Sequence, residues 1–296
     1  MDFNEYLLRQ QKRVDEALDR LLPPEEKYPS SLHKAMRYSV FSGGKRLRPV
    51  LAIAAYEAVG GEGDHVLPYA CALELIHTYS LIHDDLPAMD NDDYRRGRPT
   101  SHRMFGEGLA ILAGDALLTE AFSLMTRPEF TTGLGDEVVL RVVHELSRAA
   151  GIQGMVGGQG VDLESEGKTV EFATVEWIHT HKTGALIVSA VRIGARLGGA
   201  GEETLAALTR YAEGVGLAFQ ITDDILNVEG EERHLGKRVG TDRQRGKGTY
   251  PAVIGIERSK DTARTLLKGA VEALAMFGHN ADPLRGIARF ILERRS

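Results

Sequence analysis

The sequence of 296 residues contains a single cysteine, Cys71, and this scarcity excludes an intramolecular disulfide. Its apolar neighbours in residues 69–73 indicate a thiol packed within a helix, as expected for a protein of a reducing cytosol. Basic residues are also fewer than acidic ones: the sequence has 36 Lys and Arg and 42 Asp and Glu, which gives a formal net charge of -6. The chain therefore lacks the broad basic field that nucleic-acid binding requires, and no nucleic-acid partner is expected.

Long apolar runs are missing as well. None reaches the roughly 20 residues that a membrane-spanning helix needs. Residues 1–5 lack the basic flank and apolar stretch of a secretory signal, so we expect a cytoplasmic protein without a membrane span. Strand signals are nearly absent, with no sustained alternation and no Asn-Gly or Asp-Gly turn between apolar runs. No segment is rich enough in Pro, Gly or Ser to mark a linker, so residues 1–296 are predicted to form one domain.

What the sequence does contain is helical periodicity along its whole length, with 43% hydrophobic residues to build a core. This pattern predicts an all-α bundle of about ten helices. The glycine- and charge-rich residues 229–248 are predicted to form a mobile loop over a site. Helices are predicted over residues 3–22, 31–41, 49–59, 68–85, 109–125, 137–150, 174–197, 202–228, 249–257, 262–276 and 283–293.

Two acidic clusters each follow an apolar run: DDLPAMDNDD at residues 84–93 and TDDILN at residues 222–227. Carboxylates this close repel one another, and apolar surroundings increase the repulsion by removing water. A cation must offset it, and Mg²⁺ takes oxygen ligands and often bridges carboxylates to substrate phosphates. The two clusters are therefore predicted to hold a metal–phosphate group between two acidic walls.

In the first cluster, roughly 100° per residue places Asp84 on the helix face of His77. Pro87 then breaks the helix, which lets Asp90 share an ion with Asp84. A solvated helix end is the alternative, but several acids there would oppose the helix dipole. In the second cluster Asp223 and position 227 share a helix face, and a surface pair of aspartates stays an open alternative.

Two basic segments accompany the acids. SGGKRLR at residues 42–48 combines two glycines with three cations, and Arg grips phosphate oxygens in a fork. It is not a Walker loop, because no Ser or Thr follows the lysine. YRRGRP at residues 94–99 follows the first acidic cluster at once. The alternatives are a solvated basic turn and a surface salt-bridge network. His179 and His181 are two residues apart and are assigned no role.

Together these motifs resemble the trans-polyprenyl diphosphate synthases over nearly the whole chain. The resemblance is carried by residues 43–49, 77–99, 157–159, 182–184, 219–228 and 246–251. It implies an isoprenoid-synthase fold, an all-α bundle around a deep central cavity, and a homodimer. The implied activity is a prenyltransferase that condenses isopentenyl diphosphate with dimethylallyl or geranyl diphosphate by ionisation, condensation and elimination.

The resemblance also implies site residues, with three Mg²⁺ ions on the allylic diphosphate. The implied metal ligands are Asp84, Asp85, Asp90, Asp223 and Asp224. The implied contacts to the departing diphosphate are Arg95, Lys182, Lys237 and Lys247. The implied contacts to isopentenyl diphosphate are Lys45, Arg48, His77 and Arg96, and the polar groups near the carbocation are Thr183 and Gln220. One departure is Asn227, where the family usually has Asp. We expect weaker affinity for a metal at position 227, because the charge is lost. We expect activity to be kept, because the Asn227 side chain still has an oxygen acceptor.

Tyr79 and Ser80 occupy the positions just before the first acidic cluster, where residues of the resembled family form the bottom of the cavity and limit the length of the product. The bulky Tyr79 implies a fifteen-carbon farnesyl product, with geranylgeranyl diphosphate as the alternative. A class I terpene cyclase also uses an Asp-rich motif and Mg²⁺, but it holds no second diphosphate, so the basic segments speak against it. A non-catalytic subunit is a further alternative, although such chains typically lose the acidic residues that are present here.

Overall fold

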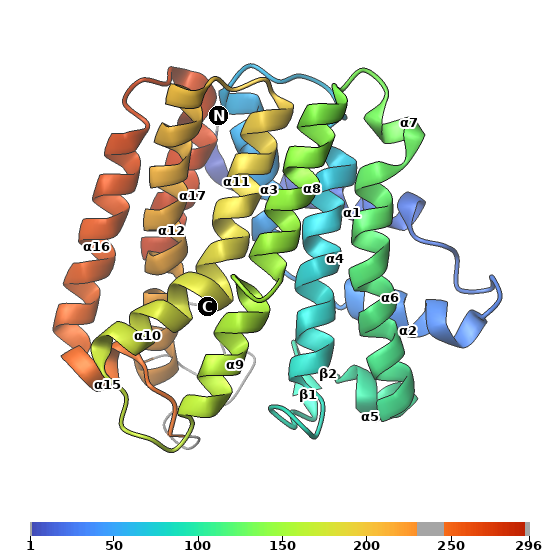
Figure 1. The fold of residues 1–296 in the computed structure, drawn as a ribbon. Helices are drawn as coiled ribbons and strands as arrows, with labels where there is room; N and C mark the ends of the chain where they lie inside the picture. The colour runs from blue at the N-terminus through green and yellow to red at the C-terminus, as the bar shows by residue number, and fades with distance from the viewer. Residues whose placement is uncertain (1, 230–245, 294–296) are drawn as a thin grey trace. The chain divides into compact units, whose positions relative to one another are not determined.

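The computed structural model describes residues 2–229 and 246–293, and these are almost entirely helical (Figure 1). Two compact units are distinguished and are described separately. The first comprises Met1–Ile53 and Gly63–Val143, and the second comprises Ala54–Glu62 and His144–Ser296. Within the described ranges the only strands are β1 (Tyr94–Arg95) and β2 (Arg98–Pro99), so the predicted all-α class is confirmed.

The first unit is built around α4 (Leu67–Asp84), an apolar helix that is buried on almost every side. A helix that is apolar all round has to be covered all round, and α4 lies against α6 (Glu107–Thr126) along much of its length (Figure 1). The unit also contains α1 (Phe3–Leu21), α2 (Ser30–Val40), α5 (Ser101–Phe105) and α7 (Pro128–Thr131). Two more helices, α3 (Leu47–Ala58) and α8 (Asp136–Ala150), begin in this unit and end in the second.

The second unit is organised along α12 (Glu202–Glu229), a helix of 28 residues that ends with the second acidic cluster. The fully buried Tyr211 of α12 donates its hydroxyl to the carbonyl of Leu284 at 2.6 Å, which ties α12 to α17 (Asp282–Glu293). The other elements are α9 (Met155–Ser165), α10 (Phe172–Ile178), η1 (His179–Gly184), α11 (Ala185–Leu197), α15 (Tyr250–Ile254), α16 (Ile256–Ala273) and η2 (His279–Ala281).

Most predicted helices are present within a few residues of their expected bounds, but several predictions are wrong. The helix expected over residues 249–257 ends at Ile254, because Gly255 has a φ of +83°, and the helix expected over residues 262–276 already begins at Ile256. The short helices α5 and α7 were not predicted.

Residues 174–197 were expected to form one helix, whereas the structure has α10, the π-helix η1 and then α11. Helix α9 was not predicted at all, because three glycines in its first half weaken the helical pattern. π-helices are rare in proteins, and those that occur are often found at functional sites. The side chains of η1 are therefore candidates for a functional role.

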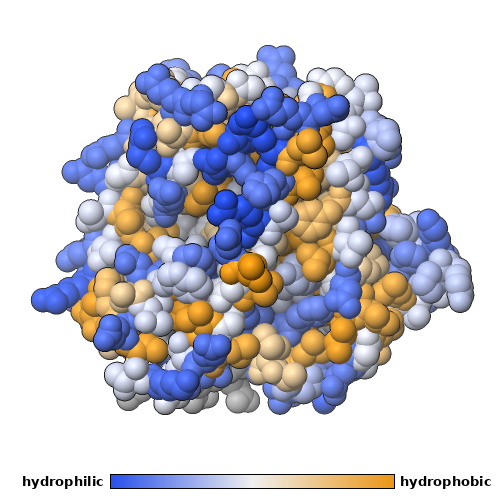
Figure 2. Space-filling model, viewed as in Figure 1, coloured by the Kyte–Doolittle hydropathy of each residue, from blue (hydrophilic) through white to orange (hydrophobic). Residues whose placement is uncertain are grey.

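Helix α6 is, among the described helices, the one that is long and apolar enough to span a membrane by length and composition alone. The buried core helices of soluble proteins pass the same test, so this property is weak support for a span. Its exposed face carries Ile111 and Leu112, which are 43% and 56% exposed. On the face drawn in Figure 2, hydrophobic and hydrophilic residues are intermixed.

Candidate active site

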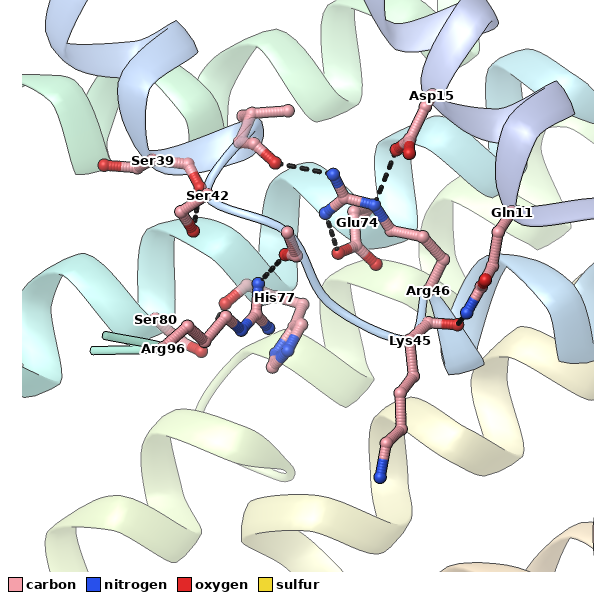
Figure 3. Close-up of polar contacts among 12 residues, drawn as sticks. Gln11, Asp15, Ser39, Ser42, Lys45, Arg46, Glu74, His77, Ser80 and Arg96 are labelled. Atoms are coloured by element: carbon pink, nitrogen blue, oxygen red, sulfur yellow. Dashed lines mark hydrogen bonds and ion pairs between the residues drawn. The ribbon is translucent and has the colours of Figure 1, made fainter. Parts of the chain in front are cut away.

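The basic loop at residues 42–48 is anchored by Arg46, which is 3% exposed. Its guanidinium donates to Glu74 at 2.7 Å, to Asp15 at 2.8 Å and to the carbonyl of Val40 at 2.7 Å (Figure 3). Burial alone would lower the pKa of Arg46, but the charges and hydrogen bonds of Glu74 and Asp15 outweigh it and raise the pKa. Arg46 therefore stabilises the conformation of the loop, a role that the sequence analysis did not assign to it.

The anchor leaves the other cations of this loop pointing elsewhere. The carbonyl of Lys45 accepts a hydrogen bond from Gln11 at 2.8 Å, while its side chain extends away from the Arg46 network (Figure 3). Arg96 donates to the carbonyl of Gly43. Gly44 has a φ of +131° and lies so close to Arg96 that a Cβ would come within 2.6 Å of its guanidinium. Glycine is required there because it alone combines this backbone with this close approach.

Cations crowd this part of the first unit. Burial, followed by the charge of Arg96, lowers the pKa of Arg48 to about 10, and Glu74 offsets this only in part. Burial and then the charges of Arg48 and Arg96 hold the pKa of His77 well below 6.5, with Arg95 and Arg46 adding to the effect. Like charges held together in this way are stabilised by an anion. The predicted contacts Lys45, Arg48, His77 and Arg96 thus form a region suited to a phosphate.

The first acidic cluster follows the end of α4, where Asp84 is the last helical residue. A tight turn then folds back, so that the Asp90 backbone N–H donates to the Asp84 carbonyl at 2.8 Å. Asn91 completes the turn with a φ of +53°. The chain thus brings Asp84 and Asp90 together at the backbone, as the break at Pro87 predicted.

Asp85, the residue after Asp84, contacts Arg95. The carboxylate is 3% exposed and accepts from Arg95 Nε and Nη2 at 2.6–2.9 Å. Burial raises the pKa of Asp85, and Arg95 offsets this only in part. Arg95 is placed by the β1–β2 hairpin, whose two-residue turn Arg96-Gly97 has positive φ at both positions. Positive φ at both positions is typical of a tight hairpin turn. The sequence did not predict this hairpin, because Arg-Gly is not one of the usual turn pairs.

The two predicted chain-length residues lie one helical turn before Asp84. Tyr79 is 6% exposed, and its ring meets that of His83 edge-on at 5.7 Å between centroids. The Ser80 hydroxyl donates to the carbonyl of His77 at 2.9 Å. Burial, with a smaller effect from Asp84, raises the pKa of Tyr79 to about 12, so the ring is neutral and bulky.

In the second unit, two predicted lysines meet at a carboxylate that sequence reasoning missed. Lys182 Nζ lies 2.6 Å from Asp162 Oδ2, and Lys247 Nζ lies 3.7 Å from the same atom. Burial would raise the pKa of Asp162, but the two lysines outweigh it and lower the pKa. Gly158, one turn before Asp162, lets α9 approach η1, since a Cβ would lie 2.3 Å from the Lys182 backbone nitrogen.

The second acidic cluster is linked to the predicted polar residues. Thr183 Oγ1 donates to Gln220 Oε1 at 2.9 Å, and Gln220 Nε2 donates to Asp224 Oδ1 at 3.1 Å. Asp223 is half-buried, whereas Asp224 and Asn227 are each 3% exposed. Thr183, Gln220 and Asp224 therefore form one connected group. The remaining predicted contact, Lys237, lies outside the described residues.

Among the described residues, no three His, Cys, Asp or Glu side chains lie together as a ready-made metal site. This donor set still suits Mg²⁺, which keeps several waters and is usually bound by one or two carboxylates together with substrate phosphates. Asp84 and Asp90 offer such carboxylates in the first unit, and Asp223 and Asp224 offer them in the second. The residues present therefore fit a magnesium ion that arrives with a diphosphate.

The depressed pKa of His77 predicts a measurable loss of stability in acid. The folded state keeps this imidazole neutral, while the unfolded chain takes up a proton as the pH falls below about 6.5. Stability contributed by His77 is therefore present above that pH and is lost below it, by about 1.4 kcal/mol per pH unit at most. Urea unfolding of His77→Gln at pH 6.5 and 5.5 should show a smaller difference than the natural chain. An equal difference in both proteins would contradict this.

Comparison with known proteins places these features in context. A model of the polyprenyl synthetase family matches residues 29–276. A dimethylallyltranstransferase of Fischerella ambigua is 48% identical over 98% of this chain and 83% of its own length. A farnesyl diphosphate synthase of Geobacillus stearothermophilus is 46% identical over 95% of this chain and 93% of its own length.

Solved structures agree in fold. The crystal structure of a geranylgeranyl pyrophosphate synthetase from Pyrococcus horikoshii matches with a TM-score of 0.89 at 34% identity, covering 99% of this chain and 100% of that chain. The similar proteins thus span the whole chain and differ in the product for which they are named.

Proposed function

Because this chain belongs to the polyprenyl synthetase family and is a short-chain prenyltransferase, we propose that it condenses isopentenyl diphosphate with an allylic diphosphate. The observation that carries the proposal is the pairing of a crowded cationic region with an acidic turn in the first unit. Arg48, Arg96 and His77 suit one diphosphate, and Asp84 with Asp90 suits a metal-bound second one. An enzyme with a single diphosphate substrate would need only the acidic half.

We propose that Asp84, Asp85 and Asp90 bind Mg²⁺ on the allylic diphosphate, and we propose the same role for Asp223 and Asp224. The metal supplies charge stabilisation for the leaving diphosphate. Asp85 keeps its bidentate contact and thereby holds Arg95 ready for the same diphosphate. Lys182 and Lys247, brought together by Asp162, add cations to the departing group, and Lys237 is proposed to join them.

The condensation itself relies on groups that touch the second substrate. Lys45, Arg48, His77 and Arg96 bind the diphosphate of isopentenyl diphosphate and place its double bond against the allylic cation. Thr183 and Gln220 present polar oxygens to that cation, which stabilises its positive charge. The double bond attacks, a new carbon–carbon bond forms, and a proton is lost to the departed diphosphate. Water has to be kept from the cation, which it would otherwise trap as an alcohol. The loop predicted for this task, residues 229–248, lies mostly outside the described residues.

For the product, we propose farnesyl diphosphate, with Tyr79 limiting the chain at fifteen carbons. The support is the buried and bulky phenol one turn before Asp84. A geranylgeranyl product is the second candidate, because relatives of similar identity are named for it, including one of Cyanophora paradoxa at 45%.

Replacing Tyr79 with alanine should lengthen the product by at least one five-carbon unit, because removing the ring opens space beyond the chain end. Chromatographic sizing of dephosphorylated products measures this, and Ser80→Ala tests the second predicted chain-length position in the same way. An unchanged product distribution would show that Tyr79 does not set the length.

The experiment that tests the activity supplies radiolabelled isopentenyl diphosphate with five-, ten- and fifteen-carbon primers and Mg²⁺. We expect label in longer prenyl chains, with the fifteen-carbon primer extended least. Release of diphosphate from farnesyl diphosphate alone, without isopentenyl diphosphate, would indicate a terpene cyclase instead. Turnover that appears only on addition of another subunit would indicate a non-catalytic partner chain.

We further propose that residues 1–296 act as one catalytic domain in the cytoplasm and that the chain forms a homodimer. The exposed Ile111 and Leu112 of α6 support an apolar contact between two copies. Sedimentation equilibrium should give twice the chain mass of 32.4 kDa.

A further inference from the structure

His179 is a buried histidine to which neither the sequence motifs nor the proposed chemistry gives a role. It opens the π-helix η1 and is 5% exposed. Its Nε2 donates to Asp224 Oδ2 at 2.7 Å, a short contact to a carboxylate of the second acidic cluster. His179 therefore reaches across 45 positions of the chain to a proposed metal ligand.

Asp224 receives two further donors. The backbone N–H of Tyr250 donates to the same Oδ2 at 3.0 Å, and Gln220 Nε2 donates to Oδ1 at 3.1 Å. A carboxylate has about four acceptor positions, so these three bonds leave one, on Oδ1, for a metal or its water ligand. The orientation of Asp224 is thus fixed by hydrogen bonds and is not left to the metal.

The ring of His179 is held as well. It stacks on the ring of Tyr250 at 5.3 Å between centroids and an interplanar angle of 29°. Tyr250 is fully buried and directs its hydroxyl toward Glu176 at 3.4 Å. His179 consequently connects α12 to Tyr250, three residues after Lys247.

His181, in the same π-helix, provides a contrast. Its ring stacks on that of Trp177 at 3.9 Å, and its Nδ1 lies 2.8 Å from the Trp177 carbonyl. His179 and His181 are thus the same type of residue in the same π-helix, but of the two it is His179 that contacts the second acidic cluster.

We propose that His179 is a positioning residue that holds Asp224 in the orientation that binds the magnesium–diphosphate group. This inference rests on the proposed function, since it concerns the same acidic cluster. Hydrogen-bond partners of metal ligands typically contribute about 10- to 100-fold to metal affinity. Loss of the Nε2 donor should therefore weaken metal binding while leaving the isopentenyl diphosphate contacts, which lie on other elements, unchanged.

The test compares His179→Phe, which keeps the ring and its stacking, with His179→Gln, whose side-chain nitrogen can replace the Nε2 donor. Calorimetric titration of Mg²⁺ in the presence of inorganic pyrophosphate gives metal affinity without catalysis. We expect about tenfold weaker binding for the Phe variant and a value within about twofold of the natural chain for the Gln variant. His181→Phe is the matched control and should bind like the natural chain.

Kinetics supply the second readout. In the Phe variant the Mg²⁺ concentration for half-maximal rate should rise about tenfold, with the KM for isopentenyl diphosphate unchanged. Equal affinity of the Phe variant and the natural chain would overturn the proposal. So would equal weakening by Phe and Gln, because it would show a structural effect of any replacement. If the Phe variant does not fold, His179→Met makes the same comparison.

The two proposals fail separately. A natural chain that makes no prenyl product would refute the proposed function, while the pyrophosphate titration would still decide the role of His179. A natural chain that is active, together with a Phe variant of normal metal affinity, would refute the role of His179 alone.

Discussion

Replacing Asp84 with asparagine is expected to lower kcat about 10³-fold, the largest effect that we predict for a single substitution. The asparagine keeps the shape and one oxygen, but it removes a charge from the turn where Asp90 folds back onto Asp84. A loss of this size corresponds to about 4 kcal/mol of transition-state stabilisation. Steady-state kinetics at saturating substrate and Mg²⁺ measure it.

The acidic run itself offers a matched control. Asp93 lies in the same segment but pairs with Arg103 at 3.2 Å on the surface, where both side chains are more than half exposed. Asp93→Asn should therefore keep kcat within about twofold, because an exposed pair contributes little. Equal losses in the two variants would mean that general charge in the segment, and not a ligand at Asp84, supports the reaction.

Replacing Glu74 with glutamine is expected to lower the free energy of unfolding by about 3 kcal/mol. Glu74 and Arg46 are each 2% exposed at the side chain and lie 2.7 Å apart. Removing Glu74's charge leaves the buried guanidinium with Asp15 as its one remaining carboxylate partner among the described residues, and an undercompensated buried charge is costly. Urea unfolding at neutral pH gives the value.

Glu137→Gln is the control for this measurement, since Glu137 forms an exposed pair with Arg141. Loss of this exposed ion pair should change the free energy of unfolding by about 0.5 kcal/mol or less. A change below about 1 kcal/mol for Glu74→Gln would contradict the anchoring role that we assign to Arg46. A raised KM for isopentenyl diphosphate in Glu74→Gln would further link the anchor to the basic loop.

The parts of this protein that local sequence determines were predicted well. Helix α12 was expected over residues 202–228 and runs over Glu202–Glu229, because its apolar residues recur with helical spacing. The turn after Asp84 was likewise expected, since Pro87 cannot continue a helix. Thr183 and Gln220, which the resemblance implied to lie near the carbocation, are hydrogen-bonded to each other, although that bond was not predicted.

The parts that depend on distant partners were not predicted. Arg46 was only grouped with the other cations of residues 42–48, and its buried partner Glu74 lies 28 residues away. His179 was dismissed because it could not share an ion with His181, yet its partner Asp224 lies 45 residues away. Asp162 carried a signal, because it follows Gly157-Gly158-Gln159 within one helical turn, but the helix there was not recognised.

The most direct test is a crystal structure of the complex with Mg²⁺ and a non-ionisable allylic diphosphate analogue. We predict metal ions bonded to the analogue and to carboxylates of both acidic clusters, with Asp84 and Asp223 among them. An analogue bound without any ion at those carboxylates would contradict our central conclusion, that these acids act through magnesium to release the diphosphate.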